Sequence, residues 1–185
     1  MKTVKKIITA QFGYYPELSM GDKDLLAWAF KARKNAQAPY SNYYVGVAVR
    51  SAFSGMIYSG CNVERASYTQ TTHAEQNAID SMVRQEGPVK IHTLALVAAP
   101  ASDKGGEFMV IAPYDNQALI SAIDQIPVPC GHCLQIIWEN CFNDQSVRLI
   151  AKAPNGQIVV TTIGDALPMK FGPKELGVDY SKIAK

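Results

Sequence analysis

Two short segments rich in metal-binding residue types constrain the fold of this chain more than any other feature. The first is His-Ala-Glu at residues 73–75, and the second is Pro-Cys-Gly-His-Cys at residues 129–133. Zinc prefers nitrogen and sulfur ligands, and a catalytic zinc site uses three protein ligands and keeps one position for water. His73, Cys130 and Cys133 match this requirement. The fold must therefore bring together two segments that lie far apart in the sequence.

Both segments stand where the sequence predicts that a helix begins. Backbone N–H groups at a helix N-terminus favour negative charge, which helps to hold Cys130 and Cys133 as thiolates. The two-residue spacing between these cysteines lets both sulfur atoms reach one ion. Glu75 would then lie beside the position left for water, where a carboxylate can act as a proton shuttle.

Two plainer interpretations remain open for these residues. A structural zinc site would need a fourth protein ligand, and His132 is the nearest spare donor, although three groups from one tight turn would then have to point at one ion. Taken alone, Glu75 would be read as an ordinary first-turn glutamate that interacts with the helix dipole. The pairing of Glu75 with His73 favours the catalytic interpretation over both.

Length and composition predict one soluble domain. The chain has 185 residues, of which 48% are hydrophobic and 18% charged, with a net charge of +2. One domain over residues 1–185 is expected, with an insertion at 101–125 that would be a surface loop, a lid or a subunit contact. The small net charge and scattered lysines argue against a nucleic-acid partner, and no apolar stretch approaches the roughly 20 residues that span a membrane. A cytoplasmic location is expected.

Two further cysteines, Cys61 and Cys141, lie in apolar patterns. Disulfides are rare in the cytosol, so we expect both to be small buried side chains and not metal ligands.

The pattern of apolar residues predicts an α/β fold of three layers, α/β/α, around a mixed sheet of five strands. The predicted helices span residues 19–35, 72 to just before Gly87, and the segment after Pro129, with a short helix at 116–123. The predicted strands span residues 44–50, 56–61, 91–98, 147–152 and 157–163. Asn155-Gly156 is a favoured hairpin turn between the last two strands.

Several blocks of the chain resemble the cytidine deaminase family. They are residues 38–46 (Ala-Pro-Tyr-Ser-Asn-Tyr-Tyr-Val-Gly), 60–68 (Gly-Cys-Asn-Val-Glu-Arg-Ala-Ser-Tyr), both zinc segments, and 167–176 (Leu-Pro-Met-Lys-Phe-Gly-Pro-Lys-Glu-Leu). The zinc segments match the deaminase signature His-x-Glu with Pro-Cys-x-x-Cys. A hairpin between the last two strands is similar to the nucleoside branch, whereas deaminases of larger nucleic acids run these strands parallel.

The resemblance implies zinc-dependent hydrolytic deamination of cytidine and deoxycytidine to uridine and deoxyuridine, with release of ammonia, in pyrimidine salvage. His73, Cys130 and Cys133 would hold Zn²⁺, and Glu75 would transfer protons between water, N3 and the departing amine. Asn62 and Glu64 match the family's pair that recognises the ribose 3′-hydroxyl. Tyr43 stands at the position of the aromatic residue whose ring packs on the pyrimidine. It also implies a homo-oligomer, a dimer or a tetramer, in which residues 66–68 help to complete neighbouring sites.

The chain departs from the family pattern at four places. Tyr43 stands where phenylalanine is usual, Leu134 where arginine or lysine is common, and Gln76 where three-cysteine members carry arginine; the fourth is the insertion at 101–125. These departures leave two alternatives open. One is a deaminase of another free cytosine nucleoside, such as a nucleoside antibiotic, and the other is a non-catalytic, zinc-stabilised interaction domain.

Overall fold

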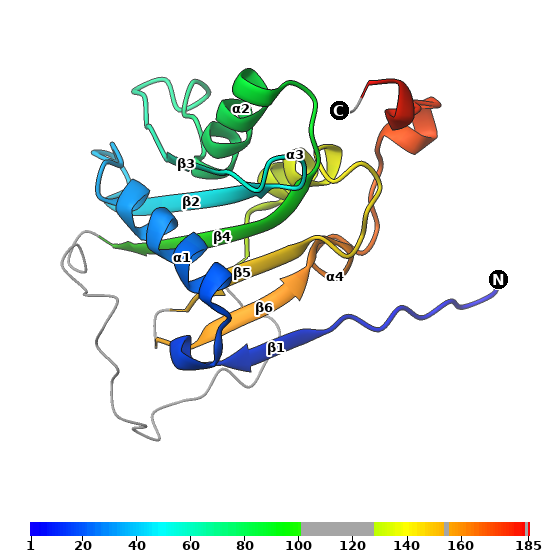
Figure 1. The fold of residues 1–185 in the computed structure, drawn as a ribbon, viewed down its shortest axis with the longest axis horizontal. Helices are drawn as coiled ribbons and strands as arrows, with labels where there is room; N and C mark the ends of the chain where they lie inside the picture. The colour runs from blue at the N-terminus through cyan, green and yellow to red at the C-terminus, as the bar shows by residue number, and fades with distance from the viewer. Residues whose placement is uncertain (101–127, 154–155, 184) are drawn as a thin grey trace.

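The computed structural model describes residues 1–100, 128–153, 156–183 and 185. Its sheet and helices follow the predicted order (Figure 1). The elements are β1 (Ala10–Gly13), α1 (Met20–Arg33), β2 (Tyr43–Ser51), β3 (Ile57–Cys61), α2 (Ala74–Glu86), β4 (Ile91–Pro100), α3 (Gly131–Glu139), β5 (Arg148–Lys152), β6 (Ile158–Thr162) and α4 (Ile163–Ala166). Short 3-10 helices at Tyr15–Glu17, Pro173–Leu176 and Tyr180–Lys182 complete this set.

The described residues form one six-stranded sheet, in the order β1-β6-β5-β4-β2-β3. Only the β4–β5 pair is parallel among these neighbours, so the sheet is mixed, as predicted. The predicted number of five strands was wrong, because β1 was missed. Strand β1 has four residues and pairs antiparallel with β6 at the edge of the sheet (Figure 1).

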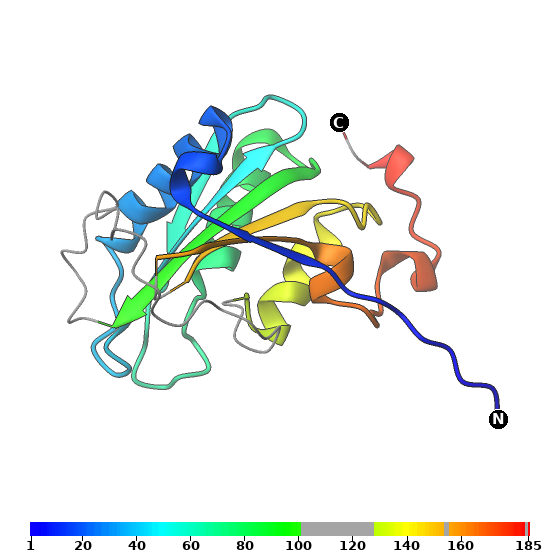
Figure 2. The ribbon, with the colours of Figure 1, turned by 90° about the horizontal axis from the view of Figure 1, so that it is seen from below.

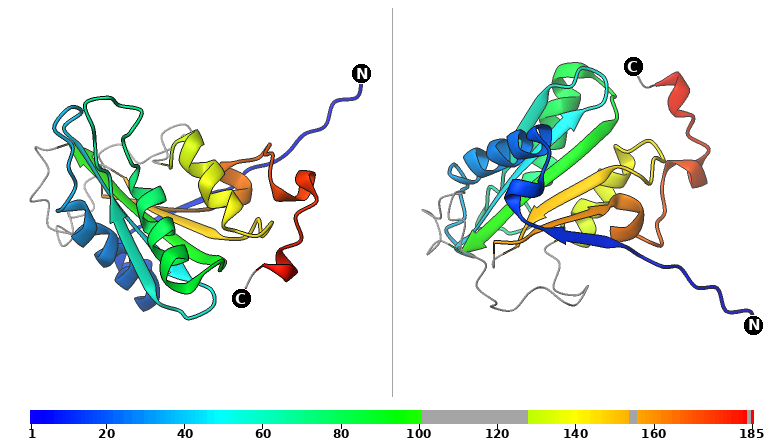
Figure 3. Two further views of the ribbon diagram at one scale, coloured as in Figure 1. Left: turned by 90° about the horizontal axis from the view of Figure 1, so that it is seen from above. Right: turned by 60° about the horizontal axis from the view of Figure 1, so that its bottom comes forward.

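The predicted three layers are confirmed. Helix α1 covers one face of the sheet, and α2 and α3 cover the other (Figures 2 and 3). Successive residues of β2 alternate between these faces, because Val47 and Val49 pack with α2 while Ala48 packs with α1. The core on the α1 side consists of Leu25, Leu26, Ala29, Ala48, Ala95, Val97, Ile150 and Ile158. The core on the other side includes Val47, Val49, Ile79, Met82, Leu94, Leu96, Ile137 and Leu149.

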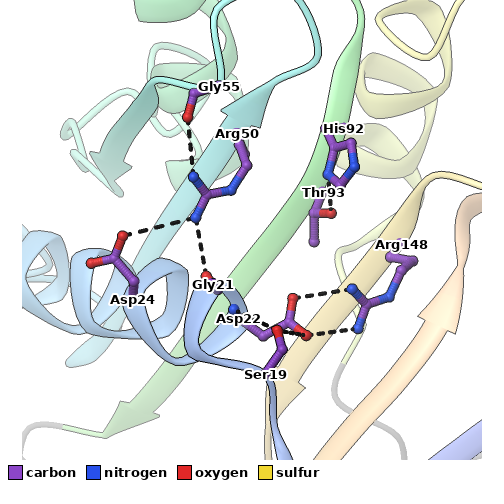
Figure 4. A network of polar contacts seen from close by, with 9 residues as sticks. All are labelled: Ser19, Gly21, Asp22, Asp24, Arg50, Gly55, His92, Thr93 and Arg148. Carbon is purple, nitrogen blue, oxygen red and sulfur yellow. Dashed lines mark hydrogen bonds and ion pairs between the residues drawn. The ribbon is translucent and has the colours of Figure 1, made fainter.

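Polar contacts fix the start of α1 on the sheet. The Ser19 hydroxyl accepts a hydrogen bond from the Asp22 N–H at 3.2 Å, which is a standard N-cap. Arg148 on β5 then donates two hydrogen bonds of 3.0 Å to the buried Asp22 carboxylate (Figure 4). These bonds and burial act in opposite directions on the pKa of Asp22: burial raises it, while the bonds from Arg148 and Ser19 lower it to a net value below the usual one.

Two glycines allow helices to approach the sheet closely from opposite faces. A Cβ at Gly46 would lie 2.1 Å from the Ala29 carbonyl oxygen of α1, and one at Gly60 would lie 2.5 Å from the Ala78 nitrogen of α2. Real side chains do not tolerate such distances, so only glycine fits at either position. The position of α2 on the sheet therefore depends on Gly60.

The antiparallel register of β5 and β6 agrees with the predicted hairpin. Its turn residue Asn155 lies outside the described residues, and Gly156 next to it has a positive φ of 85°. The predicted insertion at 101–125 and the short helix at 116–123 also lie outside the described residues. Among the helices that the structure describes, none is long and apolar enough to cross a membrane.

Candidate active site

The three predicted zinc ligands come together at the N-termini of two neighbouring helices. His73 is the N-cap of α2, Cys130 is the N-cap of α3, and Cys133 lies in the first turn of α3. The Nδ1 atom of His73 is 3.3 Å from the Cys133 sulfur and 3.6 Å from the Cys130 sulfur. All three ligand atoms lie within 4.8 Å of one another, a spacing that one tetrahedral zinc ion can bridge.

The chemistry of these groups also fits a bound cation. Cys133 is completely buried, and burial raises the pKa of its thiol well above the usual range; the nearby Glu75 carboxylate and the Cys130 thiol raise it further. A divalent cation would reverse this unfavourable grouping, because it stabilises thiolates directly. The donor set of one imidazole and two sulfurs is that of a zinc site, so the residues present fit Zn²⁺.

Among the residues that the structure describes, no fourth ligand of a structural zinc site lies with this group. His132 is exposed, and its ring centroid lies 5.5 Å from that of His73 in an edge-on arrangement. Within the described part of the chain, the group of potential metal ligands contains His73, Cys130 and Cys133, without His132. This geometry favours a site with an open position.

Glu75 is the second residue of α2 and is only 4% exposed. The carboxylate is near enough to Cys133 to raise the pKa of that thiol, yet it is not one of the grouped ligands. A buried carboxylate beside the metal ligands, but not among them, has the placement that a proton-transferring group requires.

Asn62 holds the start of strand β2. Its Oδ1 accepts a hydrogen bond from the Val45 N–H, and its Nδ2 donates one to the Tyr43 carbonyl oxygen, both at 2.9 Å. The side chain is 9% exposed. The side-chain amide of Asn62 therefore bonds to the backbone of β2 just beyond the end of β3, as the backbone of a further strand residue would.

Glu64 holds the loop that precedes β2. Its Oε2 accepts hydrogen bonds from the N–H groups of Tyr40 at 2.9 Å and Ser41 at 3.2 Å, and its Oε1 accepts one from the Ser41 hydroxyl. Burial raises the pKa of Glu64, but these bonds outweigh it, so the net pKa lies below the usual value. Three of the roughly four acceptor positions of a carboxylate are thus used by the protein itself.

The segment with Asn62 and Glu64 is directly connected to the metal ligands. Val63 exchanges two backbone hydrogen bonds, of 2.9 and 3.0 Å, with Thr72, the residue before His73. Both predicted halves of the site therefore belong to one continuous framework.

Tyr43 lies at the start of β2 and is 43% exposed. Two other exposed tyrosines contact each other: the ring centroids of Tyr40, three residues before Tyr43, and Tyr68 lie 5.8 Å apart. The departure at Leu134 has a clear structural reason, since this side chain is 6% exposed and packs in the core beneath α3. Gln76 is half-buried on α2.

Two residues of this region were not singled out from the sequence. Ser41 lies between Glu64 and Tyr43, and its hydroxyl contacts both. Arg33, at the end of α1, is 4% exposed and donates hydrogen bonds to the carbonyl oxygens of Tyr44, Ala99 and Pro100. The sequence carries a weak signal for Arg33 only: an arginine at the apolar spacing of a helix has to find buried acceptors.

Comparison with known proteins identifies the family. Residues 20–147 match the family model described as the cytidine and deoxycytidylate deaminase zinc-binding region. A cytidine deaminase of Sporosarcina psychrophila is 33% identical over 157 residues, which cover 85% of this chain and 96% of that protein. A cytidine deaminase of Serratia proteamaculans is 31% identical over 162 residues, but these cover only 42% of that longer protein.

Solved structures agree with these relationships. The crystal structure of cytidine deaminase from Burkholderia pseudomallei matches with a TM-score of 0.60 and 28% identity, covering 80% of this chain and 97% of that one. The structure from Mycobacterium tuberculosis matches with a TM-score of 0.58 and 25% identity, covering 83% and 99% of the two chains. The chain described here belongs to the cytidine and deoxycytidylate deaminase family.

Proposed function

We propose that the protein catalyses the hydrolytic deamination of cytidine and deoxycytidine. In this reaction water adds at C4 of the ring, the C4–N bond to the amino group breaks, and uridine or deoxyuridine and ammonia are released. The observation that carries the proposal is the convergence of His73, Cys130 and Cys133 beside the buried carboxylate of Glu75. Zinc held there would supply a water whose pKa is lowered toward about 7.

Glu75 is the proton carrier in this proposal. Its carboxylate accepts a proton from the water, delivers it to N3 of the ring, and later protonates the departing amine. Burial of Glu75 supports this role, because the group is shielded from bulk water and held at the start of a helix. Cys130 and Cys133 balance the charge of a divalent cation, while neutral His73 adds none.

Asn62, Glu64 and Tyr43 bind the remainder of the nucleoside in this proposal. Glu64 keeps one acceptor position beyond its three hydrogen bonds to the protein, which is sufficient for one sugar hydroxyl. The exposed ring of Tyr43 offers a face on which a pyrimidine can stack.

A nucleoside panel tests the activity. Cytidine, deoxycytidine and base-modified cytosine nucleosides are assayed for ammonia release and loss of cytidine absorbance, with and without a chelator. We expect turnover of cytidine and deoxycytidine that disappears with the chelator and returns with zinc. We also expect Glu75→Gln to lower kcat roughly 10²- to 10⁴-fold while retaining one zinc ion per chain.

The panel also separates the alternatives. Turnover restricted to a modified nucleoside would show a different substrate of the same chemistry. Zinc binding without any turnover would favour a non-catalytic domain, and undiminished turnover by Glu75→Gln would refute the role of Glu75.

We further propose that the chain is one domain and works as a cytoplasmic homo-oligomer in pyrimidine salvage. All four cysteines are free thiols, as expected for a reducing compartment. Residues 65–70 form an exposed loop in which Tyr68 is 70% exposed, a surface suited to a neighbouring subunit. Light scattering on the purified protein distinguishes a monomer, which would contradict this part, from a dimer or tetramer.

A further inference from the structure

The hydroxyl group of Ser41 connects two parts of the substrate side of the site. It donates a hydrogen bond to Oε1 of Glu64 and accepts one from the Tyr43 N–H at 3.1 Å. The backbone N–H of Ser41 donates a second bond to Glu64, at 3.2 Å to Oε2. Ser41 is thus bonded twice to the carboxylate and once to the residue whose ring is exposed.

The chain around Ser41 is fixed on both sides of this contact. Asn42 turns the chain sharply with a left-handed backbone φ of 54°, a conformation that asparagine tolerates better than most residues. Its N–H bonds to the Ala38 carbonyl oxygen at 3.0 Å. Beyond the turn, Asn62 binds the Tyr43 carbonyl oxygen, and the buried guanidinium of Arg33 binds that of Tyr44 at 3.0 Å.

The hydrogen bond from the Tyr43 N–H is the contact that joins the start of β2 to the Ser41 side chain. The carbonyl oxygen of Tyr43 is held by Asn62, whereas its N–H is bonded to the Ser41 hydroxyl. Without that hydroxyl, the Tyr43 N–H loses its bond to Ser41, and the Glu64 carboxylate keeps only its bonds to the N–H groups of Tyr40 and Ser41.

We infer that Ser41 is a positioning residue, which sets the Tyr43 ring relative to the Glu64 carboxylate before a nucleoside binds. The inference rests on the proposed function, in which these two side chains contact the substrate. Holding them in advance lowers the ordering cost of binding. Glu75 and the metal ligands lie on α2 and α3, so Ser41 acts on KM and not on kcat.

The test compares Ser41→Ala with Ser41→Thr, which keeps a hydroxyl. We expect Ser41→Ala to raise KM for cytidine about tenfold, with kcat within about twofold of wild type and zinc content unchanged, and Ser41→Thr to restore most of the loss. Amide hydrogen exchange at Tyr40, Ser41 and Tyr43 should accelerate in Ser41→Ala and not in Ser41→Thr, while residues 74–78 keep their protection.

Ser54 provides a matched control at the opposite end of α2. Its hydroxyl donates to the Glu86 carboxylate and accepts the Met56 N–H at 3.1 Å, the same pair of contacts with the same two-residue spacing. We expect Ser54→Ala to accelerate exchange locally, near Met56, and to leave KM for cytidine unchanged.

The outcomes keep this inference separate from the proposed function. If wild type turns over cytidine but Ser41→Ala leaves KM unchanged, or lowers kcat alone, Ser41 does not position the substrate groups. If wild type does not turn over cytidine, the proposed function fails; exchange at Tyr43 then still decides whether Ser41 orders the loop, and unchanged exchange overturns that as well.

Discussion

The two halves of the site differ in how their polar atoms are used. In the metal half, the side chains of His73 and Cys130 form no capping hydrogen bond with their helices, and Cys133 is a buried thiol close to a carboxylate. In the half that we propose binds the sugar (the sugar half), Asn62 and Glu64 are bonded to the backbone of residues 40–45. The metal half is therefore incomplete without a cation, whereas the sugar half is already held by the protein itself.

The two halves thus obtain their geometry in different ways, one from a bound ion and the other from hydrogen bonds within the protein. A metal half whose ligand atoms contact mainly one another gains its order from the ion, so the free energy of metal binding contributes directly to folding. A sugar half built from satisfied donors keeps its geometry with or without ligand, and only its last free positions serve recognition. Mutations in the two halves should consequently have different signatures.

The largest effect is expected in the metal half, for Cys133→Ala. Loss of a buried ligand should reduce zinc from one ion per chain to almost none and deamination below detection, because two remaining ligands bind zinc weakly. Zinc content and melting temperature with and without a chelator measure this. The chelator should lower the melting temperature of wild type and leave that of Cys133→Ala unchanged.

Cys141→Ala is the control for that variant. Cys141 is also completely buried and follows α3, but it lies outside the ligand group. We expect it to cost about 1 kcal/mol of stability while zinc stays bound. Full zinc occupancy in Cys133→Ala would contradict our assignment of the ligands.

An intermediate effect is expected in the sugar half, for Glu64→Gln. The change removes charge-assisted hydrogen bonds, each worth about 1.5–3 kcal/mol, and weakens the loop that carries Tyr43. KM for cytidine should rise roughly 10- to 100-fold with zinc content unchanged, as measured by steady-state kinetics and metal analysis.

Glu86→Gln is the corresponding control. The Glu86 carboxylate also accepts three hydrogen bonds, from the hydroxyl groups of Ser51, Ser54 and Tyr58. It lies eleven residues beyond Glu75, or roughly 16 Å along α2. Glu86→Gln should lower stability without changing KM; an equal rise in KM for both variants would show that the Glu64 effect is only structural.

The smallest effect concerns the ion pair of Lys90 and Asp144, 2.8 Å long, between the segments that follow α2 and α3. The hydrogen bonds from Lys90 and Ser146 lower the pKa of Asp144 to about 2. Because the pKa in the folded protein is depressed, the pair stabilises the fold above about pH 4, and this contribution disappears as pH falls toward 2.

Asp144→Asn should therefore cost about 1 kcal/mol at pH 7 and almost nothing near pH 2. The expected cost is small because the two side chains are 39% and 32% exposed and water screens the pair. Urea unfolding at both pH values measures it. The more exposed Asp24, 3.8 Å from Arg50, gives a control whose replacement by Asn should cost less stability at pH 7.

Much of the fold could be predicted from the chain itself, since α1, α2, α3 and five strands follow local apolar patterns. Strand β1 could not, because Ala-Gln-Phe-Gly is too short to establish a pattern and pairs with β6, almost 150 residues away in sequence. Helix α4, of four residues, is likewise too short to have a period. Both depend on contacts that exist only after the sheet has formed.

The candidate site likewise has a part that could be predicted from the sequence and a part that could not. The metal ligands could be proposed from residue type and spacing, because zinc accepts few donors and the fold brings these donors together. The bonding of Asn62 to the start of β2, the bonding of Glu64 to the loop before β2, and the place of Ser41 between Glu64 and Tyr43 could not. Such contacts depend on where a tight turn positions its N–H groups, which no residue pattern specifies.

The missing side chain at Gly60 has a consequence for the chemistry on α2. A methyl group on residue 60 would lie 2.5 Å from the nitrogen of Ala78, which stands one turn beyond the first residue of that helix. An extra carbon there would lift the helix, and with it both the His73 imidazole and the Glu75 carboxylate, away from the two sulfurs on the neighbouring helix. The distance between the two segments that carry the zinc ligands thus depends on the absence of a side chain at one position of an edge strand.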